Sequence, residues 1–414
     1  MSSRRELLRG AALLPLLAAG GPRRVRATTT RPGDRIAAAI EHWDSLGVHR
    51  TGTDADARTA DWLLAESLRL GADARLEAFP FRRRTPLAAS LTLPDGRVLE
   101  GVPLFDGGET GPDGLRARLG ADGDADGGAL PVLRVPPYDS LPGARALDDA
   151  RRAAVHPGIV TVTDDRTVLP GLALLNAESW HAPFGPPVLQ LPSEHLDTLR
   201  GLAGAEVRLD VRFEEARVTA SNVRAEITGR APDLAPVVVI TPRSSWWHST
   251  SERGGGIALW LDLLHMLGTT RPLRTVIFSA NTGHELGHVG MQRFLDENEA
   301  LVSGAHCWVH LGANFAAALH PQVRLQASDA DTMALADAAL ARHRTPPMVR
   351  TELGAPPFGE ARDIHAGRGR YLSILGANGA FHHPADRWPD SVDLQRTVDI
   401  ARAFREVLGA LAFR

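Results

Sequence analysis

The sequence predicts an α/β fold with a mixed, mainly parallel sheet and helices on both faces, interrupted by an inserted β-rich region. After residue 218, short apolar runs alternate with helical patterns, and this alternation is typical of largely parallel sheets. Residues 237–240 are apolar without a break, as expected for a strand that is buried on both faces. Residues 82–216 instead place short strand patterns among dense Gly, Pro and Asp, which indicates a separate, mainly β segment.

Residues 1–30 have the pattern of a twin-arginine export signal. Arg4 and Arg5 precede an apolar run at 11–19, and small residues suited to cleavage end at Ala27. The apolar run is too short to span a bilayer as a stable helix. We therefore expect the twin-arginine machinery to export the chain to the periplasm, the cell surface or the medium. Cys307 is the only cysteine, which is compatible with folding before export.

Composition excludes some classes of partner. The chain has 414 residues, of which 43% are hydrophobic and 23% are charged, as in ordinary globular proteins. Its net charge of -3 gives no reason to expect a nucleic-acid partner. No apolar stretch has the length of a transmembrane span.

The pattern of each segment predicts its secondary structure. Near the N-terminus, helices begin at about Asp34 and before Leu63, and a strand follows at 76–81. Residues 107–128 are rich in Gly and Asp and read as a long loop. The remaining expected strands are 159–162, 188–191, 207–213, 222–227, 237–240, 276–278 and 307–311. The remaining expected helices are 193–202, 257–267, 329–341 and one from about 392. These patterns divide the chain into an α/β domain of residues 31–81 and 217–414 and an insert of residues 82–216.

Residues 284–288, His-Glu-Leu-Gly-His, follow a predicted strand and a glycine turn. Ionisable side chains at the carboxyl end of a strand are typical of α/β active sites. One interpretation is the H-E-x-x-H zinc motif, in which His284 and His288 share one helix face and Glu285 is the general base. A second is a strand-end hydrolase site in which only some of these residues act. A third is an ordinary helix start, with Glu285 favourable in its first turn.

Five segments in order resemble the zinc-dependent aminopeptidases of the bacterial leucyl aminopeptidase and glutamate carboxypeptidase type. The segments are HRTGT, the stretch VRAEITGRAPDLAPVVVITPRSS, ERGGGIALWLDLL, HELGHVGMQRFL and FHHPADRWPDSVD. The resemblance covers nearly everything after the export signal. The insert is similar in position to the protease-associated domain of many members. The resemblance implies a zinc exopeptidase fold and a peptide or small amide substrate.

The resemblance also implies where metal ligands fall, and two of the five are lost. Members hold two zinc ions with two His, two Asp and one Glu, and use a second Glu as base. Matched residue by residue, two ligands are kept as Glu285 and His382, and the bridging Asp becomes Glu252. The first His falls on Pro242 and the second Asp on Gly312, neither of which offers a side-chain ligand, and the base falls on His284.

Arginines beside these positions speak against two metal ions. Arg243 and Arg253 flank the altered positions, and a guanidinium stays protonated, so its charge repels a dication. Arg253 could bind substrate, or could form a salt bridge to a carboxylate such as Glu252 that replaces the metal charge. Histidines could replace the lost ligands, because in strand alternation His310 lies on the same face as Gly312 and its side chain could reach the vacated position. We therefore expect at most one zinc ion, with ligands drawn from Glu252, His284, Glu285, His310 and His382.

Substrate contacts are expected from Arg243, Trp246, Arg253, Arg362 and Asp363. Trp246 could line a pocket or be buried under the insert, and Arg362 and Asp363 could form a surface salt bridge instead. His284 and Glu285 are the expected catalytic residues. The predicted function is an exported, metal-dependent hydrolase of peptides or amides. The alternatives are a non-catalytic peptide- or glycan-binding protein and an H-E-x-x-H metallopeptidase.

Overall fold

The computed structural model describes residues 31–122 and 127–414. The export signal expected at residues 1–30 lies outside the described residues. Within the described part of the chain, no helix combines the length and apolar character needed to cross a membrane.

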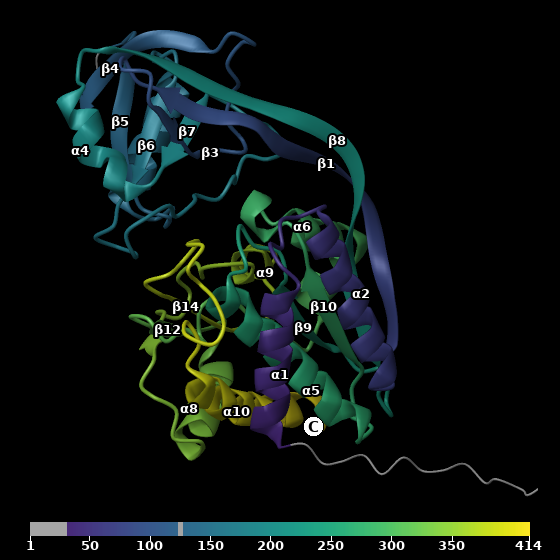
Figure 1. The fold of residues 1–414 in the computed structure, drawn as a ribbon. Helices are drawn as coiled ribbons and strands as arrows, with labels where there is room; N and C mark the ends of the chain where they lie inside the picture. The colour runs from purple at the N-terminus through teal and green to yellow at the C-terminus, as the bar shows by residue number, and fades with distance from the viewer. Residues whose placement is uncertain (1–30, 123–126) are drawn as a thin grey trace, which may run out of the picture. The chain divides into compact units, whose positions relative to one another are not determined.

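The expected helices and strands are present in the predicted order, with some differences in extent (Figure 1). The helices are α1 (Pro32–Ser45), α2 (Asp54–Arg69), α3 (Pro142–Ala153), α4 (Leu196–Gly201), α5 (Gly255–Gly268), α6 (Val289–Glu297), α7 (Glu299–Gly304), α8 (Ala330–Arg342), α9 (Ala361–Ala366) and α10 (Leu394–Ala412). Short turns of other helix types are η1 (Ser193–His195), η2 (Thr250–Gly254) and η3 (His284–Leu286). The strands are β1 (Asp73–Thr92), β2 (Val98–Glu100), β3 (Val102–Pro103), β4 (Leu115–Asp122), β5 (Leu130–Val135), β6 (Ile159–Thr163), β7 (Val188–Leu191), β8 (Glu206–Ile227), β9 (Val237–Pro242), β10 (Val276–Asn281), β11 (Cys307–Leu311), β12 (Gln322–Ala327), β13 (Val349–Arg350) and β14 (Tyr371–Ala377). The structure also has elements that the sequence analysis did not predict, including α3, α9, β5, β12 and β14.

The centre of the main sheet is parallel, as predicted. Strand β9 pairs in parallel with β10 and β11, and β11 pairs in parallel with β14. The flanking pairs β10–β8 and β14–β12 are antiparallel. The fold class is therefore a mixed, mainly parallel α/β sheet, and the carboxyl ends of β9, β10 and β11 meet at one edge.

Both faces of this sheet are covered by helices. Alternate residues of β9 point to opposite sides, so that Val237 and Val239 pack with α1, α5 and α10 while Val238 and Ile240 pack with α6 and α9. All six residues of β9 are buried. The uninterrupted apolar run that predicted this strand is explained by burial on both faces.

Strands β1 and β8 form one long antiparallel ribbon (Figure 1), with paired residues from Asp73–Glu226 to Thr92–Arg208. The sequence predicted shorter strands at 76–81, 207–213 and 222–227. The proposed division at residues 81 and 217 therefore falls inside two continuous strands. The loop expected at 107–128 was a wrong prediction in part, because β4 lies within it and pairs with β8. Gly and Asp density marks turns but does not exclude a short strand between them.

Candidate functional site

Residues 284–288 do not form one helix. Strand β10 ends at Asn281, and Gly283 takes a left-handed φ of 79° before the single turn η3. Gly287 and His288 are also left-handed, with φ of 70° and 60°, and only then does α6 begin. The H-E-x-x-H interpretation was therefore wrong in its premise, since it needs both histidines on one face of a continuous helix. Instead the rings of His284 and His288 stack with centroids 4.7 Å apart.

Glu285 is held by Ser244, a residue that the sequence analysis missed. The Ser244 hydroxyl donates to Oε2 of Glu285 at 2.6 Å and accepts from the backbone N–H groups of Gly283 and His284. Ser244 follows the end of β9, next to the turn that follows β10. Its position two residues beyond Pro242, at the carboxyl end of a central strand, was the available signal.

Arg253 lies between Glu252 and Glu285, and these three residues with His382 form the centre of the site. Its Nη2 atom lies 2.8 Å from Oε1 of Glu252 and 2.7 Å from Oε1 of Glu285. Its Nε donates to the backbone carbonyl of Ser244 at 2.8 Å. Burial lowers the pKa of the Arg253 guanidinium, but the charges of Glu252 and Glu285 outweigh burial and raise it above its ordinary value. One of the two interpretations of Arg253 was a salt bridge to a carboxylate such as Glu252, and this salt bridge is present.

Glu252 also faces His382. Oε1 of Glu252 lies 3.4 Å from Nε2 of His382, and neither side chain is exposed. Nδ1 of His382 donates to the backbone carbonyl of Leu174 at 2.6 Å, which directs Nε2 toward Glu252. Burial raises the pKa of Glu252, but Arg253 and His382 outweigh this effect and lower it to about 2. Glu252 is therefore a buried carboxylate held charged by its neighbours.

The turn η2 that carries Glu252 and Arg253 is fixed by buried acids. Asp386 accepts from the backbone N–H groups of Ser251 and Glu252 at 2.8 and 3.1 Å. Asp44 accepts from the hydroxyl of Thr250 and from Nε of Arg387. These contacts tie the turn to α1 and to the loop before α10, so Arg253 is held in place from several elements.

The donor set does not fit a zinc centre. Two candidate ligands are Glu252 and His382, because Oε2 of Glu252 and Nε2 of His382 are buried without a hydrogen-bond partner, although Oε1 of Glu252 forms an ion pair with Arg253. The third, Glu285, has its oxygens engaged by Ser244 and Arg253. A catalytic zinc site uses three protein ligands. Among residues 31–122 and 127–414, no three His, Cys, Asp or Glu side chains are placed to hold one metal ion.

The other predicted ligands and arginines lie apart from this centre. Arg243 is fully buried, and its Nη1 donates to the Asp56 carboxylate at 2.7 Å. It therefore has no surface on which to contact a substrate. The ring of His310 fills the space beside Gly312, since a Cβ atom there would lie 2.8 Å from Cε1 of His310. His310 thus occupies the place of the missing side chain, as strand alternation suggested.

A cavity of about 490 Å³ lies beside the centre. Its polar lining includes His284, His288 and His310, and Phe358 and Phe381 add apolar surface. Nε2 of His310 is buried without a partner. Burial, reinforced by neighbouring charges, lowers the pKa of His284 well below its ordinary value and that of His310 to about 3. Both rings are therefore neutral near pH 7 and can donate or accept a hydrogen bond.

Two carboxylates orient the stacked histidines. Nδ1 of His288 donates to Asp363 at 2.7 Å, and Nδ1 of His284 lies 3.4 Å from Oε1 of Glu360. Burial raises the pKa of Glu360 to about 7. Glu360 and the pairing of His288 with Asp363 were missed, because both depend on a loop more than seventy residues downstream of η3.

The remaining residues that were expected to contact substrate, Arg362 and Trp246, contact side chains from residues 82–216. Arg362 donates to Glu178 at 2.6 Å, so the surface salt bridge considered for this loop is formed across the cavity wall. Trp246 is buried and stacks on Phe105 with ring centroids 4.7 Å apart. Tyr138 also lines the cavity and donates to the backbone carbonyl of Asn378.

Known proteins resemble this chain in sequence over a short segment. Aminopeptidase NAALADL1 of Mus musculus is 32% identical over 101 residues, which is 23% of this chain and 14% of that protein. The match thus spans about a seventh of the relative's own length. No family model matches the chain.

Solved structures resemble it over nearly the whole length. The zinc aminopeptidase BSAP from Bacillus subtilis has a TM-score of 0.74 at 14% identity, covering 92% of this chain and 95% of that one. The aminopeptidase from Aneurinibacillus sp. strain AM-1 has a TM-score of 0.69 at 13% identity, covering 92% and 94%. The chain therefore has the fold of the zinc aminopeptidases, as the five sequence motifs implied.

Proposed function

We propose that this protein binds peptides or small amides without hydrolysing them, on a peptidase fold whose metal centre is replaced by an internal ion-pair network. One observation carries the proposal. The guanidinium of Arg253 lies between Glu252 and Glu285 at 2.8 and 2.7 Å, so its charge neutralises the carboxylates that would otherwise attract a cation. A dication placed beside this fixed charge would be repelled in a site of reduced dielectric.

The cavity is suited to a peptide ligand. Its volume of about 490 Å³ lies in the range of small-ligand sites. Neutral imidazoles of His284 and His310 offer hydrogen bonds to amide groups, and Phe358 offers an exposed apolar surface. Arg362 and Glu178 add one charge of each sign at the wall.

The test of this proposal is binding without turnover. Purified protein is titrated calorimetrically with a panel of di- to tetrapeptides, with and without EDTA, and leucyl p-nitroanilide is used to measure hydrolysis. We expect at least one peptide to bind equally in both conditions and no zinc-stimulated hydrolysis. His284→Ala should weaken that binding, and His306→Ala, outside the cavity lining, is the matched control. Hydrolysis that requires zinc and is lost in Glu252→Gln would overturn the proposal.

A second candidate function is hydrolysis with a single zinc ion. It is favoured by one observation: Nε2 of His382 lies 3.4 Å from Oε1 of Glu252, and neither this nitrogen nor Oε2 of Glu252 has a hydrogen-bond partner. Such hydrolysis requires Arg253 to leave both Glu252 and Glu285. Stoichiometric zinc in the purified protein would support it.

Export through the twin-arginine route remains part of the proposal, as does the division into a peptidase-like core and a protease-associated-like insert. A reporter fused after Ala27 should leave the cytoplasm, and the double substitution Arg4→Lys and Arg5→Lys should retain it. Export that is insensitive to that substitution would contradict the proposed route.

A further inference from the structure

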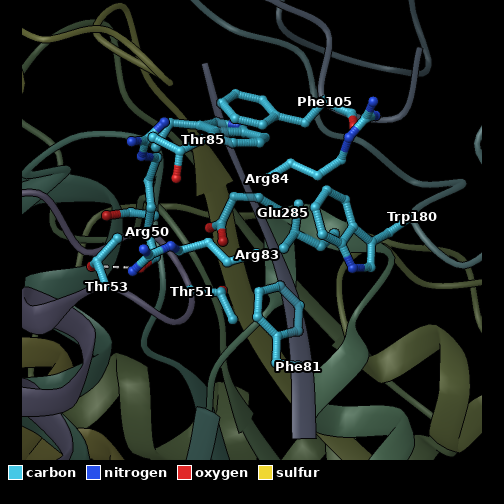
Figure 2. A pocket seen from close by; sticks show the side chains of 13 residues that line it. Arg50, Thr51, Thr53, Phe81, Arg83, Arg84, Thr85, Phe105, Trp180 and Glu285 are labelled. Atoms are coloured by element: carbon cyan, nitrogen blue, oxygen red, sulfur yellow. Dashed lines mark hydrogen bonds between the residues drawn. The ribbon is translucent and has the colours of Figure 1, made fainter. Parts of the chain in front are cut away.

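A smaller pocket shares no lining residue with the cavity of about 490 Å³. It has a volume of about 30 Å³ and is lined by the loop before α2, by residues of β1 and by the loops that carry Phe105, Trp180 and Trp246 (Figure 2). A role for this smaller pocket does not rest on peptide binding in the cavity of about 490 Å³.

Two guanidinium groups line this pocket without a carboxylate partner. No ion pair joins Arg50 or Arg83 to an acid within residues 31–122 and 127–414. Nη1 of Arg83 donates to the backbone carbonyl of Gly52 at 3.0 Å, while its Nε is buried without a partner. The guanidinium of Arg50 lies 5.5 Å from the centre of the Phe105 ring.

The other charged residues of the pocket are already compensated. Arg84 pairs with Glu109 at 2.9 Å and with Glu215 at 3.3 Å. The carboxylate of Glu285 is engaged by Arg253 and Ser244. The charges of Arg50 and Arg83 are therefore left without an opposing charge at the pocket.

This arrangement is unfavourable without an anion. Burial, followed by the charge of Arg83, lowers the pKa of Arg50 from its ordinary value. Two like charges on half-buried side chains repel each other more than they would in water, and buried charges are normally paired. An anion at this position would relieve both effects.

We propose that this pocket binds a carboxylate group carried on a ligand with an aromatic or other apolar body. Guanidinium forks match the two oxygens of a carboxylate, and Thr51 and Thr85 line the same pocket. A volume of about 30 Å³ admits a planar group of roughly three heavy atoms more readily than a tetrahedral phosphate. Phe81, Phe105 and Trp180 provide the apolar wall for the rest of the ligand (Figure 2).

The test compares probes that differ only in charge. The full chain is titrated calorimetrically in a buffer free of carboxylate and phosphate with phenylacetate, with its neutral isostere phenylacetamide, with acetate and with inorganic phosphate. We expect saturable binding of phenylacetate, weaker binding of acetate, and no binding of phenylacetamide. This comparison uses the unmodified protein and so does not depend on the folding of any variant.

Variants then locate the site. Arg50→Gln should weaken phenylacetate binding by roughly tenfold or more, because charge-assisted hydrogen bonds are lost. Its melting temperature without ligand should not fall, because a repelled charge has been removed. Arg97→Gln removes an exposed arginine that is paired with Asp95 and should bind as the unmodified protein does. Equal binding of phenylacetate and phenylacetamide, binding of phosphate alone, binding of no probe, or unchanged binding by Arg50→Gln would each overturn the proposal.

Discussion

The Nη2 atom of Arg253 lies 2.8 Å from Oε1 of Glu252, and neither side chain is exposed. The same atom reaches Glu285 at 2.7 Å, so one arginine joins the two carboxylates that the resemblance assigns to metal binding. The guanidinium therefore supplies positive charge to both carboxylates.

Removal of Arg253 should strongly destabilise the protein. Arg253→Met leaves two buried carboxylates without their shared partner, and breaking a buried ion pair in this way costs about 3–5 kcal/mol. Urea unfolding at pH 7 measures the change. Arg97→Met, which breaks an exposed pair with Asp95, is the matched control and should change stability by less than about 1 kcal/mol.

Neutralising the partner should restore part of that loss. In the double variant Arg253→Met with Glu252→Gln, one of the two uncompensated charges is gone, so the two losses should not add. Losses of unfolding free energy that add, or an Arg253→Met variant as stable as the unmodified protein, would show that the ion pairs of Arg253 do not stabilise the protein.

Acid should weaken the network through Glu252. Its folded pKa is about 2, below the usual value of about 4.3 for an unfolded glutamate. A lowered carboxyl pKa contributes stability that is present above the unfolded value and is lost as pH falls from about 4.3 toward 2. The free energy of unfolding should therefore fall more steeply from pH 6 to pH 3 in the unmodified protein than in Glu252→Gln. Parallel curves would contradict the lowered pKa.

Glu360 should act in the opposite direction. Burial raises its pKa to about 7, so its contribution is fully present below the unfolded value of about 4.3 and is lost as pH rises through about 7. Asp386, with a pKa also raised to about 7 by burial, adds to the same loss. Glu360→Gln mimics the protonated form, so its unfolding free energy should decline less between pH 5 and pH 8. An unchanged decline would count against a buried, protonated Glu360.

Much of the fold could be predicted from local sequence patterns. The uninterrupted run at Val237–Ile240 marks a strand buried on both faces, and the glycines after it mark the start of α5. The length of the β1–β8 ribbon could not be predicted, because its pairing joins residues as distant as Asp73 and Glu226. Strand extent depends on such distant partners more than on local propensity.

Residues of the candidate site could be placed from the sequence only where their position along a strand determines which face the side chain lies on. His310 could be placed beside Gly312 because residues two apart on a strand share a face. Glu360 was missed, because its contact with η3 comes from a distant turn whose approach no local pattern specifies. Ser244 was missed although its position just after a central strand marks it as a candidate. The bond from His382 to the carbonyl of Leu174 likewise joins segments more than two hundred residues apart.

Tyr138 should contribute to stability through its contact with the loop after β14. Its hydroxyl donates to the carbonyl of Asn378 at 2.8 Å and accepts from the N–H of the same residue at 3.2 Å. Tyr138→Phe should cost about 1 kcal/mol and lower the melting temperature by roughly 2–4 °C. Tyr371→Phe, which removes one hydroxyl contact of 3.4 Å with His365, should have a smaller effect. An equal or larger effect of Tyr371→Phe would contradict the assigned role.

The most direct measurement is the zinc content of the purified protein, determined by elemental analysis after dialysis against micromolar zinc and then against metal-free buffer. Because Arg253 engages Glu252 and Glu285, we expect no stoichiometric zinc in the unmodified chain. Arg253→Ala, which frees both carboxylates beside His382, is the variant in which zinc binding should appear. One or two equivalents of zinc per unmodified chain would contradict the account.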